Sequence, residues 1–152
     1  MSQQWQGVRQ VSVLCLVTTD HGVDTGPLHD GLCRLVRDAA ADGAPVPVSR
    51  VGVGDHTLLA ADSLTLLVHA SVEPVDGRRI MALTIRPFRV GGDDAGTTFG
   101  AAPRAVPLAG DGADQPALAR AVRAMLAATL PWQHSTTADR PVIRPSTNNA
   151  NQ

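Results

Sequence analysis

The 152-residue chain contains no lysine and no tyrosine, so all thirteen of its basic residues are arginine. Without lysine, the chain cannot form a Schiff base with a carbonyl substrate, and it cannot supply the lysine of a P-loop to a phosphate. Without tyrosine, it has no phenol to serve as an acid or a nucleophile. Thirteen of the fourteen acidic residues are aspartate, and Glu73 is the exception.

A long apolar run is also missing. The first apolar stretch, residues 11–17, has seven residues, whereas a membrane-spanning helix needs about 18–20. The polar residues 1–7 do not resemble a signal peptide. The same start fits a mature exported protein whose leader was replaced by an initiator methionine, so composition leaves both cytoplasm and periplasm open.

The balance of charge and hydrophobicity predicts one folded domain. A net charge of −1 excludes the strong basic field of an obligate nucleic-acid binder and the acidity of a solvating tail. With 43% hydrophobic and 18% charged residues, the chain is apolar enough to bury a core. We expect a flexible amino-terminal segment over residues 1–7, a single domain over residues 8–132 and a disordered tail over residues 133–152.

Hydrophobic periodicity predicts the element order β-α-β-β-β-β-α. The expected strands cover residues 8–18, 46–53, 63–72, 79–90 and 97–106, and the helices carry apolar stripes over residues 28–39 and 118–129. Apolar residues on both faces of the first strand indicate a central strand that is covered on both faces, while prolines place the second and fifth strands at edges. Because each helix is apolar on one side, we expect both to pack on one face of a mixed sheet, in a two-layer α+β sandwich.

Turn-forming and capping residues mark the expected ends of these elements. Asp24 or Thr25 is expected to cap the first helix, and Asp114 the second. Asp76 and Gly77 predict a tight hairpin turn between the third and fourth strands, because glycine tolerates a positive φ.

Three stretches of the chain follow the pattern of a known family. They are the opening strand VSVLCLV before a Gly/Asp-rich loop and helix, the segment ADSLTLLVHASVEPVDGRRIMALTIRPF, and the closing helix ALARAVRAMLAATL. Together they resemble the amino-terminal domain of TolB, an outline shared with CsgG-type secretion lipoproteins and with the outer-membrane lipoproteins that activate penicillin-binding proteins. The resemblance covers about residues 8–130. It implies a bacterial envelope module that does not catalyse a reaction and docks onto other envelope proteins.

The two cysteines allow two interpretations. Cys15 lies in the opening strand and Cys33 on the helix that packs back over it, so their Cα atoms can approach within disulfide range. In an exported protein, a bridge closing this loop would add roughly 2–4 kcal/mol of stability. The alternative is two small buried core residues in a reducing cytoplasm.

The histidines do not predict a metal site. His21, His29 and His56 lie near aspartates, but none has the spacing of a zinc motif. His69 falls on the less apolar face of its strand, as a surface or interface residue does. No Gly-x-Ser-x-Gly elbow and no phosphate-binding glycine loop is present. We therefore expect no metal, no cofactor and no enzymatic activity.

Charge is divided unevenly along the chain. Residues 1–77 hold four arginines and nine acids, whereas residues 78–152 hold nine arginines and five acids. Arginines that contact phosphates and phenylalanines that stack on bases would suit a nucleic-acid partner. The plainest alternative is a solvated sheet edge. Arginine and aromatic residues are also favoured at protein interfaces. We predict a protein-docking surface composed of Arg86, Phe88, Arg89, Phe99 and Arg104.

These observations favour a non-catalytic protein-interaction module of the cell envelope. It would dock a partner protein, or a second copy of itself, through its sheet face or edge, and it would be periplasmic if a leader was removed. One alternative is a cytoplasmic or virion structural subunit with reduced thiols. Another is a small hydrolase or ligand binder that uses the loop at residues 20–29, in which case substituting His21 should remove an activity.

Overall fold

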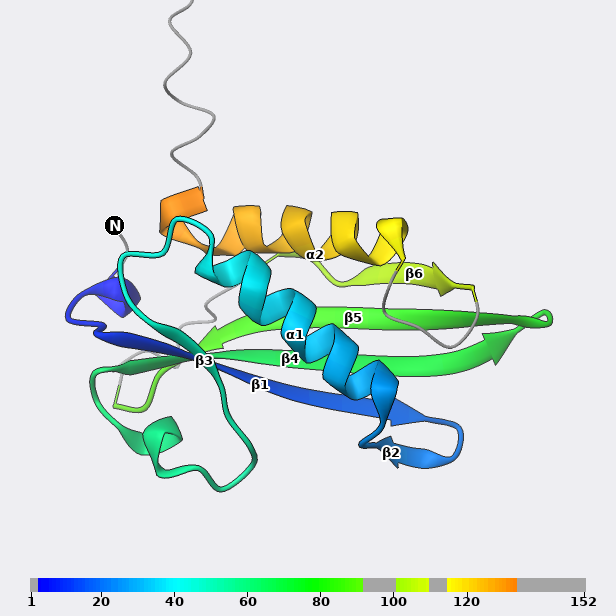
Figure 1. The fold of residues 1–152 in the computed structure, drawn as a ribbon, viewed down its shortest axis with the longest axis horizontal. Helices are drawn as coiled ribbons and strands as arrows, with labels where there is room; N and C mark the ends of the chain where they lie inside the picture. The colour runs from blue at the N-terminus through cyan, green and yellow to red at the C-terminus, as the bar shows by residue number, and fades with distance from the viewer. Residues whose placement is uncertain (1–2, 92–100, 110–114, 134–152) are drawn as a thin grey trace, which may run out of the picture.

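The computed structural model describes residues 3–91, 101–109 and 115–133, and these form one mixed sheet with two main helices (Figure 1). The elements are η1 (Gln3–Trp5), β1 (Gln10–Thr19), β2 (Gly22–Asp24), α1 (Pro27–Ala41), β3 (Val48–Arg50), η2 (His56–Leu59), β4 (Ser63–Val75), β5 (Arg78–Phe88), β6 (Arg104–Leu108) and α2 (Pro116–Thr129). The predicted α+β sandwich is confirmed. The short β2, which folds back on the end of β1, was not predicted.

The strand order across the sheet is β2-β1-β4-β5-β6. Near its start β1 also pairs with β3, on the edge that β2 occupies further along. β1 runs parallel to β3 and β4, and the β4–β5 and β5–β6 pairs are antiparallel. The prediction that the opening strand is central and that the second strand lies at an edge is therefore confirmed. The expected covering of both faces of the opening strand is wrong, because Leu16 on its second face is 42% exposed.

The core lies between one face of the sheet and the two helices. α1 crosses in front of the strands and α2 lies beside β6 (Figure 1). Alternate residues of the three central strands are almost fully buried in this layer, for example Val13, Leu66 and Leu83. The apolar stripes of the helices meet them through residues such as Leu32 and Met125. Burial of this surface, at about 25 cal/mol per Å², is the main stabilising contribution to the fold.

The start of α1 is capped by Asp24, although not from the N-cap position. Gly26 is the N-cap residue and Pro27 begins the helix. The Asp24 carboxylate accepts hydrogen bonds from the backbone N–H of Gly26 (3.0 Å) and of His29 (3.3 Å). The carboxylate thus satisfies helix donors that otherwise have no partner and lies at the positive end of the helix dipole. In α2 the N-cap is Gln115, and the predicted cap Asp114 lies outside the described residues.

The turn between β4 and β5 confirms the Asp-Gly prediction. Asp76 has φ 50° and Gly77 has φ 74°, so both central residues are left-handed. Two positive φ values match the twist of a two-residue hairpin. The tight turn fixes the register of the two long strands.

The amino-terminal segment differs from the expectation. Residues 1–7 were predicted to be flexible, but η1 forms at Gln3–Trp5 and Trp5 is buried. Its ring packs edge-on against Trp132, with centroids 5.4 Å apart, and the indole N–H of Trp132 donates to the carbonyl of Ala40. The polar residues around Trp5 gave no indication of this contact. A single large aromatic ring buries substantial apolar area by itself, so Trp5 packs into the core without apolar neighbours in the sequence.

Two strand boundaries also differ. The predicted strand at residues 46–53 is reduced to Val48–Arg50, because Pro45 and Pro47 cannot donate to the ladder. The predicted strand at residues 97–106 begins at Arg104 among the described residues and continues to Leu108. Residues 97–100 lie outside the described part of the chain, as does the predicted tail beyond Gln133.

Candidate functional site

The sheet has one face turned away from the helices, which we call the open face. Residues paired directly across neighbouring strands point to the same side of a sheet, so the register defines this face. Its members are Leu14, Leu16 and Thr18 of β1; Leu67, His69, Ser71, Glu73 and Val75 of β4; Arg78, Ile80, Ala82, Thr84, Arg86 and Phe88 of β5; and Ala105 and Pro107 of β6. Ser12 and Thr65, in the row of Phe88, point to the same side but are buried, at 3% and 1% exposure, so the face is covered over β1 and β4 at this end. The core residues alternate with them and point to the helices.

The open face combines exposed apolar side chains with a few charged ones. Phe88 is 47% exposed, Leu16 42% and Val75 50%. Arg86 and His69 are exposed between them. Single exposed apolar residues are ordinary, so these three together make the open face a candidate interaction surface and no more.

The predicted docking residues do not all lie on this face. Arg86 and Phe88 share it, as their i, i+2 spacing on β5 requires. Arg104 pairs with Leu83, a core residue, so Arg104 points to the helix side. Phe99 lies outside the described residues. The open face also includes Leu16, which the sequence prediction did not include in the docking surface. Only the tertiary structure shows that no helix covers this residue.

Arg89 has a structural role instead of the predicted docking role. Its Nε and Nη2 donate to the carbonyl of Ala61 at 3.0 and 2.8 Å. Its Nη1 donates to the carbonyls of Gln4 at 3.1 Å and Gln6 at 2.5 Å. The guanidinium thus joins the amino-terminal segment to the connection before β4. These bonds engage all three guanidinium nitrogens, so we remove Arg89 from the docking surface.

Cys15 and Cys33 form a disulfide that joins β1 to α1, with their Cα atoms 5.8 Å apart. Both residues are buried, at 7% and 2% exposure. Of the two interpretations of the cysteines, the structure supports the bridge. The bridge fixes α1 over β1, which pairs in parallel with both β3 and β4.

The histidines have local roles. His29 Nε2 lies 3.1 Å from the carbonyl oxygen of Cys15, and its Nδ1 lies 3.4 Å from Asp30. His21 and His56 are highly exposed, each near an adjacent aspartate. The described residues contain no group of three or more metal-ligating side chains. His29 therefore serves to hold the start of α1 against β1.

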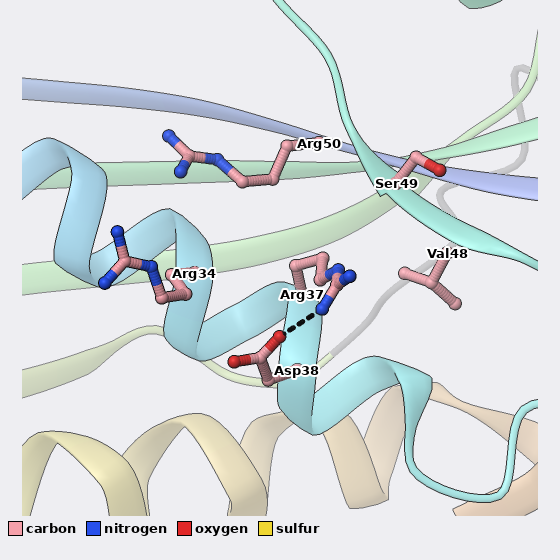
Figure 2. Close-up of a pocket in the computed structure, with 6 residues that line it drawn as sticks. All are labelled: Arg34, Arg37, Asp38, Val48, Ser49 and Arg50. Carbon is pink, nitrogen blue, oxygen red and sulfur yellow. Dashed lines mark hydrogen bonds and ion pairs between the residues drawn. The ribbon is translucent and has the colours of Figure 1, made fainter.

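A second candidate site is an open groove between α1 and β3, of roughly 420 Å³ (Figure 2). Arginines are prominent on both of its walls. The lining residues are Arg34, Arg37 and Asp38 of α1 with Val48, Ser49 and Arg50 of β3. Sequence spacing alone did not predict it, because the α1 arginines meet Arg50 only when β3 pairs beside β1.

Two of the three arginines in this groove are already engaged. Arg37 is paired with Asp38 (Figure 2), and Arg50 donates to Asp30 at 3.1 Å. Arg34 is exposed, with no ion-pair partner among the described residues. A guanidinium suits carboxylates and phosphates, but the internal pairs leave this groove weaker as a candidate than the open face.

Two aspartates have pKa values below their ordinary value of 3.8. The hydrogen bond from Arg50, followed by that from His29, lowers the pKa of Asp30. The backbone N–H of Thr57, followed by its hydroxyl, lowers the pKa of Asp55; these bonds measure 2.9 and 2.8 Å. Each carboxylate is therefore held in its charged form by the fold.

This gives a prediction for acid unfolding. A carboxyl group whose pKa is depressed on folding stabilises the protein above its unfolded pKa, and that contribution is lost as the pH falls through the folded pKa. Asp55→Asn keeps an oxygen acceptor for Thr57 but cannot titrate. We expect urea unfolding at pH 5, 4 and 3 to show a smaller loss of stability for the variant than for the wild type. Parallel losses would contradict a role for Asp55.

A third hollow, of roughly 370 Å³, lies where the β1–β2 turn meets the β4–β5 hairpin. It is lined by Thr19, Asp20, His21, Val72, Glu73, Pro74 and Arg79. His21 belongs to the loop of the ligand-binder alternative, but its side chain is 89% exposed and lies 3.6 Å from Asp20. A general base needs a position held against a substrate, and this side chain is mostly in solvent.

Comparison with known proteins adds no information on function. No protein-family model and no curated protein matches the chain. Among solved structures, the PelC dodecamer from Paraburkholderia phytofirmans in space group P6 is 13% identical, and a single-substitution variant of it in space group C2 is 14% identical. Each match covers 84% of this chain and 88% of the PelC chain, with a TM-score of 0.42. At this level the likeness has no bearing on function.

No helix among the described residues is long and apolar enough to be a candidate membrane span.

Proposed function

We propose that this protein is a non-catalytic, extracytoplasmic interaction domain that docks a protein partner through the open face of its sheet. The observation that carries the proposal is the one-sided packing of the sheet. Helices cover one face, whereas the other presents Leu16 and Phe88 nearly half exposed, with Arg86 beside Phe88.

The chemistry of the open face specifies the partner that fits it. A complementary surface must offer apolar groups to Leu16 and Phe88 and place a carboxylate opposite Arg86, because an arginine buried without a partner costs several kcal/mol. Small residues such as Ala82 and Ser71 leave room for the partner's larger side chains. A folded protein surface meets these requirements better than nucleic acid, since Arg86 is the one arginine in the middle of the face.

The disulfide supports the location outside the cytoplasm. Structural disulfides persist in oxidising compartments and are rare where thiols are kept reduced. The Cys15–Cys33 bridge is buried in the core. The resemblance of the chain to envelope modules related to TolB agrees with this location.

Site-specific photo-crosslinking in the producing cells tests the docking face. We expect benzoylphenylalanine in place of Thr84, at the centre of the open face, to give a protein adduct. Placed instead of Arg123, an exposed residue of α2, it should give none. The double variant Leu16→Thr and Phe88→Thr should reduce the adduct at position 84 about tenfold or more, because each buried side chain contributes about 1.5–3 kcal/mol.

Threonine keeps β propensity, so this double variant is expected to melt within a few degrees of the wild type. An unchanged adduct yield in a folded double variant would refute docking through these side chains. Equal adducts from positions 84 and 123 would refute the choice of face.

A further inference from the structure

We infer that the partner docked on the open face is a second copy of this chain, related by a two-fold axis across the middle of β4. The inference rests on the proposed function and names its partner. Its basis is the arrangement of charges and apolar groups along the face. Groups on one side of residue 70 have complementary groups at equal distances along the strands on the other side, so the face is complementary to itself.

The charges give the first part of the argument. Arg86 pairs with Leu67 and therefore stands three residues before the midpoint of β4. Glu73 stands three residues after it. Two copies can face each other about a two-fold axis that lies between the sheets and runs perpendicular to the strands. This rotation places the row three residues before the midpoint in one copy opposite the row three residues after the midpoint in the other. Arg86 of each copy then lies diagonally opposite Glu73 of the other, which gives two equivalent ion pairs in an isologous interface.

The outer rows show the same complementarity. Phe88 pairs with Thr65, five residues before the midpoint, and Arg78 pairs with Val75, five residues after it. In the rotated copy, Phe88 lies opposite Arg78 and beside the half-exposed Val75. A guanidinium over an aromatic ring is a favourable cation–π arrangement, and Val75 supplies an apolar contact next to it.

The central rows provide the packing. Leu16 and His69 occupy the row just before the midpoint, and Thr18, Ser71 and Ala82 the row just after it. Two facing sheets thus place larger side chains of one copy over smaller ones of the other. This alternation lets two inner faces interdigitate at the ordinary spacing of about 10 Å.

The size of the face is compatible with a reversible dimer. The rows from residue 67 to residue 75 span roughly 26 Å along the strands, and about three strands, or roughly 14 Å, lie across most of them, which gives about 370 Å² in projection. This area is below the roughly 800 Å² per partner of a standard interface, in the range of weak and transient contacts. A weak, concentration-dependent association is expected.

Sedimentation equilibrium of the full chain, from about 1 to 200 µM, tests this inference. The wild type should dimerise. Arg86→Glu or Glu73→Arg alone should each weaken dimerisation about tenfold or more, because each places like charges opposite one another twice per dimer. Combining both reversals should restore dimerisation. Arg123→Glu on α2, which reverses an equivalent charge on the helix layer, should change nothing.

Each outcome has a defined meaning. A wild type that stays monomeric, or single reversals that the double variant does not rescue, would overturn self-association about this axis. In that case a photo-adduct at position 84 to a different protein would leave the docking function intact, whereas the absence of any adduct would remove both. An adduct between two copies, together with charge-reversal rescue, supports both.

Discussion

Replacing Cys15 and Cys33 together by alanine is expected to lower the free energy of unfolding by about 3 kcal/mol. The bridge closes a loop across an 18-residue separation, and the loss of loop entropy in the unfolded chain accounts for an effect of this size. For a domain of this length, the midpoint of thermal unfolding should fall by about 10 °C. Alanine avoids burying two hydroxyl groups at positions that are almost fully covered.

Reduction supplies the matched control for this prediction. Dithiothreitol should lower the melting temperature of the wild type toward that of the double alanine variant, and it should leave the variant unchanged. Equal melting temperatures for the oxidised wild type and the double variant would contradict a stabilising bridge. They would also remove the physical support for a location outside the cytoplasm.

Replacing Arg89 by methionine is expected to destabilise the domain by about 2–3 kcal/mol. Methionine keeps much of the aliphatic bulk but loses the donors to Ala61, Gln4 and Gln6. Hydrogen bonds from a charged group contribute about 1.5–3 kcal/mol net. Release of the amino-terminal segment should also expose Trp5, so tryptophan emission should shift to longer wavelength together with the loss of stability.

Arg86→Met is the control because it makes the same replacement three residues earlier, within β5. Arg86 is exposed on the open face and has no intramolecular ion pair among the described residues. At concentrations where the chain is monomeric, its loss should change stability by less than about 0.5 kcal/mol. Unchanged emission and stability in Arg89→Met would show that the four carbonyl contacts do not hold the segment.

These two arginines show where sequence reasoning reached its limit. Arg86 lies in β5, whereas Arg89 comes directly after the last residue of that strand, Phe88, so the alternation that places Arg86 on the open face does not extend to Arg89. The sequence grouped them because both are basic and close to Phe88. Their different roles depend on segments more than twenty residues away, and a local pattern contains no information about such contacts.

Local patterns of the sequence determined several features by themselves. Hydrophobic periodicity placed both helices, the central position of β1 and the long β4–β5 pair. The Asp-Gly dipeptide located the hairpin, whereas the strand–helix placement of Cys15 and Cys33 allowed a bridge without deciding it. Each of these follows from interactions between residues close in sequence, or from a burial pattern that repeats with the period of its own element.

Tertiary structure alone decided which surfaces are available. Pairing of β3 beside β1 created the arginine groove, and docking of Trp5 with Trp132 ordered the amino-terminal segment. The register of β4 with β5 set Arg86 and Glu73 at equal distances from the centre of an uncovered face. Periodicity shows that two residues share a side, but whether that side meets a helix or solvent depends on how distant elements pack.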